Sequence, residues 1–333
     1  MLTRRQLLRF SGSQKKTEDG YWLHLSRQAM ACRFEATLPI SDQTGVNLTR
    51  DALATVGGLE QQLTVFKENS EVSYINRTAA TGAVRVEKSL FALLLLCQKL
   101  SIETKGAFDI TSGPLSDCWG FLRRQGSIPE PHAIEAARAL VGADRLMLDP
   151  ASRTIRFERA GVQINLGSIG KGYALDRIGA TIEKRVRACL LTAGSSSMRA
   201  IGSGDRDDAG WIIGVRHPRC NTRRLAVLRM RDCAMATSGG EEQYFEHKGK
   251  RYCHIIDPRS GMPADRVSSV TVVTRSAACA DALATAFFVG GPELAESYCS
   301  IHTGVLAVML ETGSERAVVF GQNDQCEVEI IGE

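Results

Sequence analysis

The sequence lacks the cysteine patterns of both disulfide scaffolds and zinc sites. Its ten cysteines include no C-x-x-C pair, and none is spaced with histidine as in a zinc finger. Several of them, such as Cys97, Cys189 and Cys279, stand in apolar segments, where cysteine behaves as a small buried hydrophobic residue. This usage favours a reducing compartment over a disulfide-linked protein.

Long apolar runs and a strong charge of one sign are missing too. The run "LFALLLLC" at residues 90–97 is far shorter than the ~20 residues of a membrane-spanning helix. The net charge of +4 over 333 residues is too small to indicate nucleic-acid binding, and a few basic side chains around an anionic ligand would account for it. We therefore expect neither a nucleic-acid partner nor stable membrane insertion.

The amino-terminal segment contains the basic part of an export signal without the apolar part. "TRRQLLRF" resembles the start of a twin-arginine export signal, but the polar "SGSQKKTEDG" follows where an apolar stretch is needed. We interpret residues 1–20 as a mobile leader and expect a cytoplasmic protein. The alternative is export to the periplasm or the membrane surface by this twin-arginine-like leader.

Alternating helix and strand signals fill the rest of the chain. Apolar spacing predicts helices over residues 49–66, 88–106 and 170–185 and around Asp281. Strands are expected around a break near Met30, in a hairpin over residues 145–158, and in a series from "ACLLTA" to the closing "EVEII". The fold class is therefore α+β, with mixed, largely antiparallel sheets and packed helices. No linker rich in Pro, Gly or Ser divides residues 21–333, which we take as a single domain.

One predicted core helix carries two oxygen-bearing side chains on the same face. In "ADALATAFFVGG", Asp281 and Thr285 stand four residues apart, one turn above the other. They could be structural, with Asp281 capping the helix and Thr285 bonding to its own backbone. Alternatively, the pair holds a hard cation.

Several other polar segments stand at the ends of predicted elements. "INLGSIGKGYALD" places a strand, a Gly-rich turn and a helix start in succession, with Lys171 adding charge; it favours an anion or is an ordinary turn. "KGAFDITSGPL" reads as a helix N-cap with Pro in the first turn, and "ATSGG" as a turn or anion nest after a strand. In "RYCHIIDPRSGMP", His254 is either a structural residue or an acid or base beside bound phosphates.

Taken together, these segments resemble the FAD:protein FMN transferases of the ApbE type. The resemblance runs from Met30 to about Gly291, and eight segments occur in the family's order. They are "AMACRFEATLP", "TVFKENSEVSYIN", "GAFDITSGPL", "INLGSIGKGYALD", "GSSSMRAIG", "ATSGGEEQYF", "RYCHIIDPRSGMP" and "SVTVVTRSAACADALATAFFVGG". The family's T-fold-like architecture is thereby implied.

The resemblance also implies a set of site residues. Mg²⁺ would be held by Asp281, Thr285 and Ser168, the last through its backbone oxygen, and His254 would be the catalytic base. FAD would be contacted by Met30, Phe66, Ala107, Phe108, Asp109, Asn165, Lys171 and Ile256.

The implied reaction is transfer of the FMN moiety of FAD to a Thr or Ser hydroxyl of an acceptor flavoprotein, with release of AMP. The alternatives are an Mg²⁺-dependent FAD pyrophosphatase, which would give FMN and AMP, and a non-catalytic FAD-binding protein. The chain departs from the family where Asn165 replaces Asp, where Phe66 replaces a frequent Tyr, and where Gly240-Glu241 replaces Asp-Tyr. These departures bear on FAD affinity and on the balance between transfer and hydrolysis.

Overall fold

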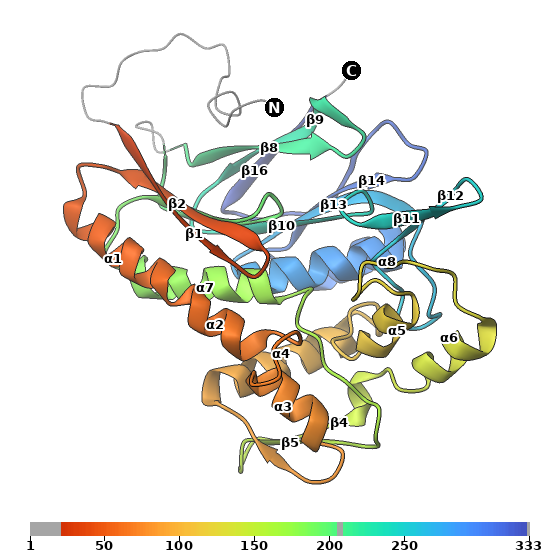
Figure 1. Cartoon of the computed structure of the whole chain (residues 1–333). Coiled ribbons are helices and arrows are strands. Elements are labelled where there is room, and N and C mark those ends of the chain that lie inside the picture. Colours follow the sequence, from red (N-terminus) through yellow and green to blue (C-terminus); the bar gives the residue numbers. More distant parts are fainter. Residues whose placement is uncertain (1–20, 205–208, 332–333) are drawn as a thin grey trace.

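An eight-stranded antiparallel sheet forms the centre of the protein (Figure 1). The computed structural model describes residues 21–204 and 209–331, so the expected leader over residues 1–20 lies outside the described residues. In spatial order the strands are β1 (Trp22–Ala29), β2 (Cys32–Pro39), β6 (Cys189–Ala193), β7 (Ser197–Ile201), β10 (Ala234–Gly239), β13 (Val267–Thr274), β14 (Leu306–Glu311) and β15 (Val318–Gly321). Each neighbouring pair is antiparallel.

Both faces of this sheet are covered. Alternate residues of a strand point to opposite faces, so Val272 packs with the helices α7 (Gly170–Ile182) and α8 (Ala277–Ile301), whereas Val273 packs on the other side. That other side is closed by a three-stranded sheet in the order β16 (Cys326–Ile330), β9 (Cys220–Met230) and β8 (Trp211–His217). Burial on two faces explains the nearly continuous apolar runs of β13 and β14.

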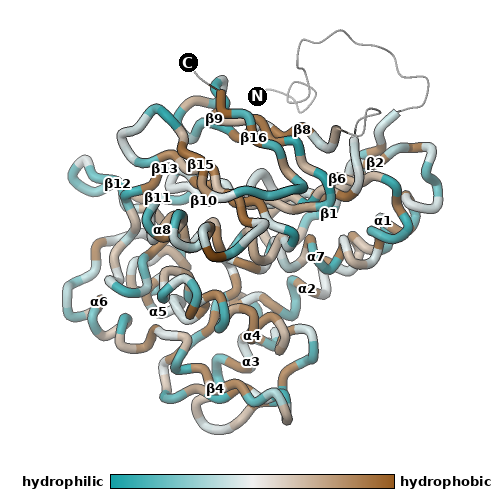
Figure 2. The backbone as a smooth tube through the Cα atoms, turned by 180° about the vertical axis from the view of Figure 1, so that it is seen from behind, coloured by the Kyte–Doolittle hydropathy of each residue, from teal (hydrophilic) through white to brown (hydrophobic). Residues whose placement is uncertain are grey.

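The remaining helices are α1 (Gln43–Ala54), α2 (Val56–Leu63), α3 (Glu71–Thr78), α4 (Lys88–Glu103), α5 (Gly113–Cys118) and α6 (Pro131–Arg138). Of these, α1 lies beside α7, and α2 to α6 lie below α7 and α8 in the view of Figure 1. A small sheet of β3 (Val84–Arg85), β5 (Thr154–Phe157) and β4 (Leu146–Asp149) packs with them. The hairpin β11 (Tyr244–His247) and β12 (Lys250–Cys253) stands apart from the large sheet, and its tip is hydrophilic (Figure 2).

The expected α+β class with largely antiparallel pairing is confirmed. The break near Met30 is a tight turn in which Met30 and Ala31 both have positive φ, and Gly106, with φ 75°, follows α4 as expected. The helix expected over residues 49–66 is divided at Thr55 into α1 and α2.

Two local expectations were wrong. Residues 164–166 form no strand; they run as extended single chain held by other segments, with the Asn165 N–H donating to the Ile110 carbonyl at 2.7 Å. "ATSGG" does not follow a strand as a turn, because Ala236 to Gly239 belong to β10 and pair with β13.

Candidate active site

Asp281 lies inside α8 and is bound by two neighbouring elements. Its Oδ2 accepts a hydrogen bond from the Gly172 N–H at 2.6 Å, and its Oδ1 accepts one from the Ser197 hydroxyl at 2.6 Å. Asp281 does not cap its own helix, because Ser276 is the N-cap of α8. Burial raises the pKa of the Asp281 carboxyl, while the charge of Lys171 and the two hydrogen bonds lower it.

A glycine is required where α7 meets α8. A Cβ atom on Gly172 would lie 2.0 Å from the Ala277 carbonyl oxygen, which is inside any permitted contact. The second glycine of "GKG" therefore lets the start of α7 approach the start of α8 closely enough for Asp281 to reach its backbone. This close contact explains why a glycine stands at position 172, which the sequence alone did not reveal.

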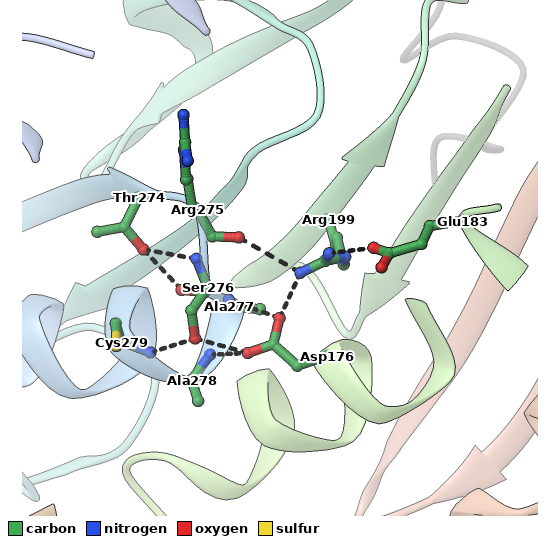
Figure 3. Close-up of polar contacts among 9 residues, drawn as sticks. All are labelled: Asp176, Glu183, Arg199, Thr274, Arg275, Ser276, Ala277, Ala278 and Cys279. Atoms are coloured by element: carbon green, nitrogen blue, oxygen red, sulfur yellow. Dashed lines mark hydrogen bonds and ion pairs between the residues drawn. The ribbon is translucent and has the colours of Figure 1, made fainter. Parts of the chain in front are cut away.

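Asp176 makes the reciprocal contact from α7 (Figure 3). Its carboxylate accepts from the Ala277 N–H at 2.9 Å, the Ala278 N–H at 3.0 Å and the Ser276 hydroxyl at 2.7 Å. Arg199 donates to the same carboxylate at 2.6 Å. Sequence reasoning missed this role, although Asp176 closes the quoted "GYALD" segment and stands four residues after Gly172.

Lys171 supplies the positive charge of this region. Its ammonium donates to the Ser196 hydroxyl at 2.5 Å, and Ser196 lies in the turn between β6 and β7. The same charge lowers the pKa of Asp281 and that of His254, so Lys171 lies within electrostatic range of both. Cys32 is a further neighbour: burial raises the pKa of its thiol, and Lys171 lowers it.

Thr285 follows Asp281 by one turn, as predicted. Its hydroxyl donates to the Asp281 carbonyl at 3.2 Å and lies 3.5 Å from the Ser238 hydroxyl. The backbone bond expected for a structural Thr is therefore present. It leaves lone pairs on the hydroxyl oxygen, so this geometry is compatible with a metal ligand as well.

The donor set fits a hard cation that takes most of its ligands from elsewhere. Within residues 21–204 and 209–331, no group of three or more His, Cys, Asp or Glu side chains is arranged to hold a metal. A single buried carboxylate and a hydroxyl are suited to Mg²⁺, which binds oxygen and is commonly shared between few protein groups, phosphate oxygens and water. Ser168, the third expected ligand, lies half-buried in the turn just before α7. Asn165 shapes that turn by accepting from the Gly167 N–H at 2.9 Å.

Phe66 and Asn165, two of the expected flavin contacts, line one pocket of about 410 Å³. We call it the Phe66 pocket; its other walls are Val65, Glu68, Ser73, Asn76, Arg77, Gly113, Asp117, Leu122, Arg123, Gln163 and Ile164. The Phe66 ring is 75% exposed, so an aromatic face is available for stacking. Asn76 fixes the opposite wall, since its side-chain amide both donates to and accepts from the Ile164 backbone, at 2.9 and 2.8 Å. Its part was not predicted.

Four other expected contacts are buried. Ala107, Phe108, Asp109 and Ile256 are each at most 6% exposed. Asp109 accepts hydrogen bonds from the Thr111 N–H and hydroxyl at 2.8 and 2.6 Å, and burial raises the pKa of its carboxyl. Direct flavin contact from these residues remains a prediction. Met30 is half-buried in the β1–β2 turn.

His254 follows β12 and is held by Gln243. The Gln243 carbonyl oxygen accepts from the His254 backbone N–H at 3.0 Å and lies 3.1 Å from the ring Nδ1. Because a carbonyl only accepts, this contact assigns the proton to Nδ1 and leaves the Nε2 lone pair free to take a proton. Burial lowers the pKa of His254, and the bond to Gln243 partly opposes that shift.

Arg259 is engaged elsewhere. Its guanidinium makes two hydrogen bonds to the Asp257 carboxylate, at 2.8 and 2.9 Å. Arg259 is thus paired with a carboxylate, whereas Lys171 donates to the neutral Ser196 hydroxyl.

Comparison with known proteins identifies the family. The ApbE family model matches residues 30–310, which is most of the chain. The chain belongs to the ApbE family. This ApbE-family chain is 29% identical over 295 residues to an FAD:protein FMN transferase of Vibrio cholerae, covering 86% of each chain. It is 32% identical over 248 residues to one of Treponema pallidum, covering 70% of this chain and 68% of the relative.

Solved structures agree with the family assignment. The ApbE protein from Thermotoga maritima matches with a TM-score of 0.81 and 27% identity, covering 91% of this chain and 97% of that one. The Pseudomonas stutzeri flavinyl transferase ApbE in its apo form matches with a TM-score of 0.78 and 26% identity, covering 91% and 95%.

Proposed function

We propose that this chain transfers the FMN moiety of FAD to a Thr or Ser hydroxyl of an acceptor flavoprotein, in an Mg²⁺-dependent reaction that releases AMP. The observation that carries the proposal is the placement of Asp281 and Lys171 where α7, α8 and the β6–β7 turn meet. Asp281 accepts from the Gly172 N–H and the Ser197 hydroxyl, both at 2.6 Å. Lys171 donates to the Ser196 hydroxyl at 2.5 Å. The names of the curated relatives, FAD:protein FMN transferases, support the same reaction class.

The reaction balances without a further reactant. The acceptor oxygen forms a bond to the FMN-side phosphorus of FAD, and the bond from that phosphorus to the bridging anhydride oxygen breaks. The hydroxyl proton passes to a base, and AMP leaves with the bridging oxygen.

Asp281, Thr285 and the Ser168 backbone would hold Mg²⁺ against the pyrophosphate. When bound, the ion neutralises charge on the phosphate oxygens and favours departure of AMP. Asp281 is kept in position by Gly172 and Ser197, and Lys171 is kept in position by Ser196. Both groups are thus oriented before the substrate arrives, which reduces the reorganisation needed in the transition state.

FAD would extend from this centre into the Phe66 pocket. Phe66 offers a stacking face there, and Asn165 offers an amide in place of the family's carboxylate. His254 would accept the hydroxyl proton at Nε2, because Nδ1 is occupied by the Gln243 carbonyl.

The deciding experiment is mass spectrometry of a Thr-containing flavoprotein subunit after incubation with this protein, FAD and Mg²⁺. A mass gain equal to the FMN moiety on one Thr or Ser, with stoichiometric AMP, supports transfer. Free FMN and AMP with an unmodified subunit would establish the pyrophosphatase instead. FAD binding without AMP release would leave a non-catalytic FAD-binding protein.

We also propose a cytoplasmic location. None of the helices in the described residues is long and apolar enough to cross a membrane. All ten cysteines are unpaired, which suits a reducing compartment. Cell fractionation tests this proposal, and recovery of the protein from the periplasm would favour the export alternative.

A further inference from the structure

The β11–β12 hairpin presents one unused edge next to the proposed base. Its two-residue turn consists of Lys248 and Gly249, both with positive φ, as in a type I′ turn. In such a hairpin, His247 and Lys250 form a hydrogen-bonded pair, and bonded pairs then recur at every second position. The His254 N–H to Gln243 carbonyl bond follows the same alternation.

This alternation determines which backbone groups point outward. Phe245 is bonded to Tyr252 across the hairpin, so the N–H and C=O groups of Tyr244 and Glu246 point away from β12. In the described part of the chain, β11 pairs with β12 alone, and no other backbone bond uses Tyr244 or Glu246. Both residues are exposed. The edge therefore has two donors and two acceptors available for another strand.

A pocket separate from the Phe66 pocket borders the same edge. We call it the hairpin pocket; it measures about 280 Å³ and is lined by Phe121, Arg124, Gly126, Glu242, Gln243, Tyr244 and Phe245. Its aromatic wall is rigid, since the Phe245 ring stacks on Tyr252 and packs against Phe121. The hairpin projects from the molecule above α5 and α6, where a second protein can approach (Figure 1).

The base lies on the same face of the hairpin as this pocket. Gln243 directly precedes β11 and is two residues from Phe245, and His254 directly follows β12 and bonds to Gln243, so the three side chains share one face. A strand added beside β11 would run about 10 Å, two strand spacings, from the His254 backbone. The His254 ring leans toward the β11 side, because its Nδ1 lies 3.1 Å from the Gln243 carbonyl oxygen.

We propose that the acceptor protein docks as an extended segment on the free edge of β11, adding a third strand to the hairpin. The segment places its Thr or Ser hydroxyl toward His254 and a side chain two residues away in the hairpin pocket. Phe121 and Phe245 favour an apolar side chain there. This inference rests on the proposed transfer function, and names the structural class of its acceptor.

The test uses a pool of nonapeptides, each with one central Thr and randomised flanking residues without Pro. The pool is incubated with the full-length chain, FAD and Mg²⁺. Peptides that gain the FMN moiety are identified by mass spectrometry, and FAD affinity and AMP release are measured in parallel without peptide.

The Glu246→Pro variant removes one outward N–H and places a ring at the edge, which an edge strand tolerates. We expect at least a tenfold lower yield of FMN-peptide, with FAD affinity and peptide-independent AMP release retained. The matched control is Glu246→Ala. It loses the same ion pair with Arg251 as the proline variant but keeps the outward backbone N–H of residue 246. This control should retain the parental yield.

A second measurement does not depend on folding of the proline variant. The best peptide is resynthesised with single N-methyl groups, and strand addition predicts loss of transfer at every second position only. Parental yield with Glu246→Pro, or uniform tolerance of N-methylation, overturns the inference. So does a parental chain that modifies the flavoprotein subunit but no peptide. A parental chain that modifies neither the flavoprotein subunit nor any peptide contradicts the proposed function itself.

Discussion

Asp176 and Asp281 cap each other's helices. Asp281, on α8, accepts the Gly172 N–H at the start of α7, and Asp176, on α7, accepts the Ala277 and Ala278 N–H groups at the start of α8. Each carboxylate thereby satisfies backbone donors that a helix start leaves unpaired and lies at the positive end of the partner helix. The two helices are fixed to each other at the point where Asp281, the proposed metal ligand, and Lys171 emerge.

Asp176 should therefore matter for stability without touching the substrate. Asp176→Ala leaves the Ala277 and Ala278 N–H groups at the start of α8 without their acceptor. It leaves Arg199 with Glu183 as its remaining carboxylate partner. We expect a loss of about 2–4 kcal/mol in the free energy of unfolding, chiefly from the unsatisfied backbone donors. Urea denaturation measures it. Glu183→Ala, which removes only the second partner of Arg199, should cost less than ~1 kcal/mol. Equal losses in the two variants would contradict the capping role.

Asp281 should matter for both stability and the metal. Asp281→Ala leaves Gly172 and Ser197 without an acceptor, which costs about 1–3 kcal/mol in unfolding free energy. It should also abolish metal-dependent AMP release. Thermal unfolding of the parent is expected to shift upward with Mg²⁺ and FAD together, because ligands that bind only the folded state stabilise it. A variant that keeps the Mg²⁺-dependent part of this shift would remove Asp281 from the metal site.

Gly172 provides a test of the close helix contact. Gly172→Ala places a methyl group 2.0 Å from the Ala277 carbonyl oxygen, so the helices must separate. We expect a loss of at least ~3 kcal/mol, beyond the usual range for overpacking because the obstacle is backbone. Gly170→Ala is the matched control, since its Cβ meets no atom within 4 Å. Alanine there should be neutral or stabilise by up to ~1 kcal/mol. Soluble yield and urea midpoints distinguish the two variants.

The sequence predicted elements better than contacts. Helices and strands with clear apolar periodicity, such as α4 and β13, lie where the sequence pattern predicted them. The apolar side chains that make the pattern are the ones that the element buries. The segment at Ile164 was mistaken for a strand because its apolar residues alternate with polar ones as strand residues do. Its backbone is instead bonded by the Asn76 side chain, 88 residues away, and no local pattern reports such a contact.

In the candidate site, too, local spacing was predictable from the sequence and the contacts between elements were not. Asp281 and Thr285 share a helix face, which i, i+4 spacing alone predicts. The reciprocal partner Asp176 and the serines at 196 and 197 could not be derived, because their partners are set by how α7, α8 and the β6–β7 turn pack. The sequence left the Gly-rich segment as either an anion-binding turn or an ordinary turn, whereas the close approach of two helices explains Gly172.

His254 gives the pH dependence of the proposed reaction. Burial lowers the pKa of its imidazole below the usual ~6.5, so the neutral base form is present at lower pH than for an exposed histidine. Transfer should rise with pH and reach its plateau at a lower pH than an exposed imidazole would give, if the hydroxyl proton is taken by Nε2. The lowered pKa also means that the folded state binds fewer protons than the unfolded state. The stability that neutral His254 contributes is therefore complete above pH ~6.5 and is lost as pH falls toward its folded pKa.

The variant His254→Asn distinguishes a role of His254 as the catalytic base from a purely structural role. Loss of a general base typically slows a reaction ~10²–10⁴-fold, so single-turnover transfer at saturating FAD should fall by that factor and lose its acid limb. Asn can still donate a hydrogen bond toward the Gln243 carbonyl, which preserves the local link. FAD affinity, measured on the same samples, should remain near the parental value. If affinity and unfolding midpoint fall together while the transfer rate at saturation stays high, His254 is a structural residue and another group takes the proton. Asp257 would be a weak substitute, because both its carboxylate oxygens already accept from Arg259.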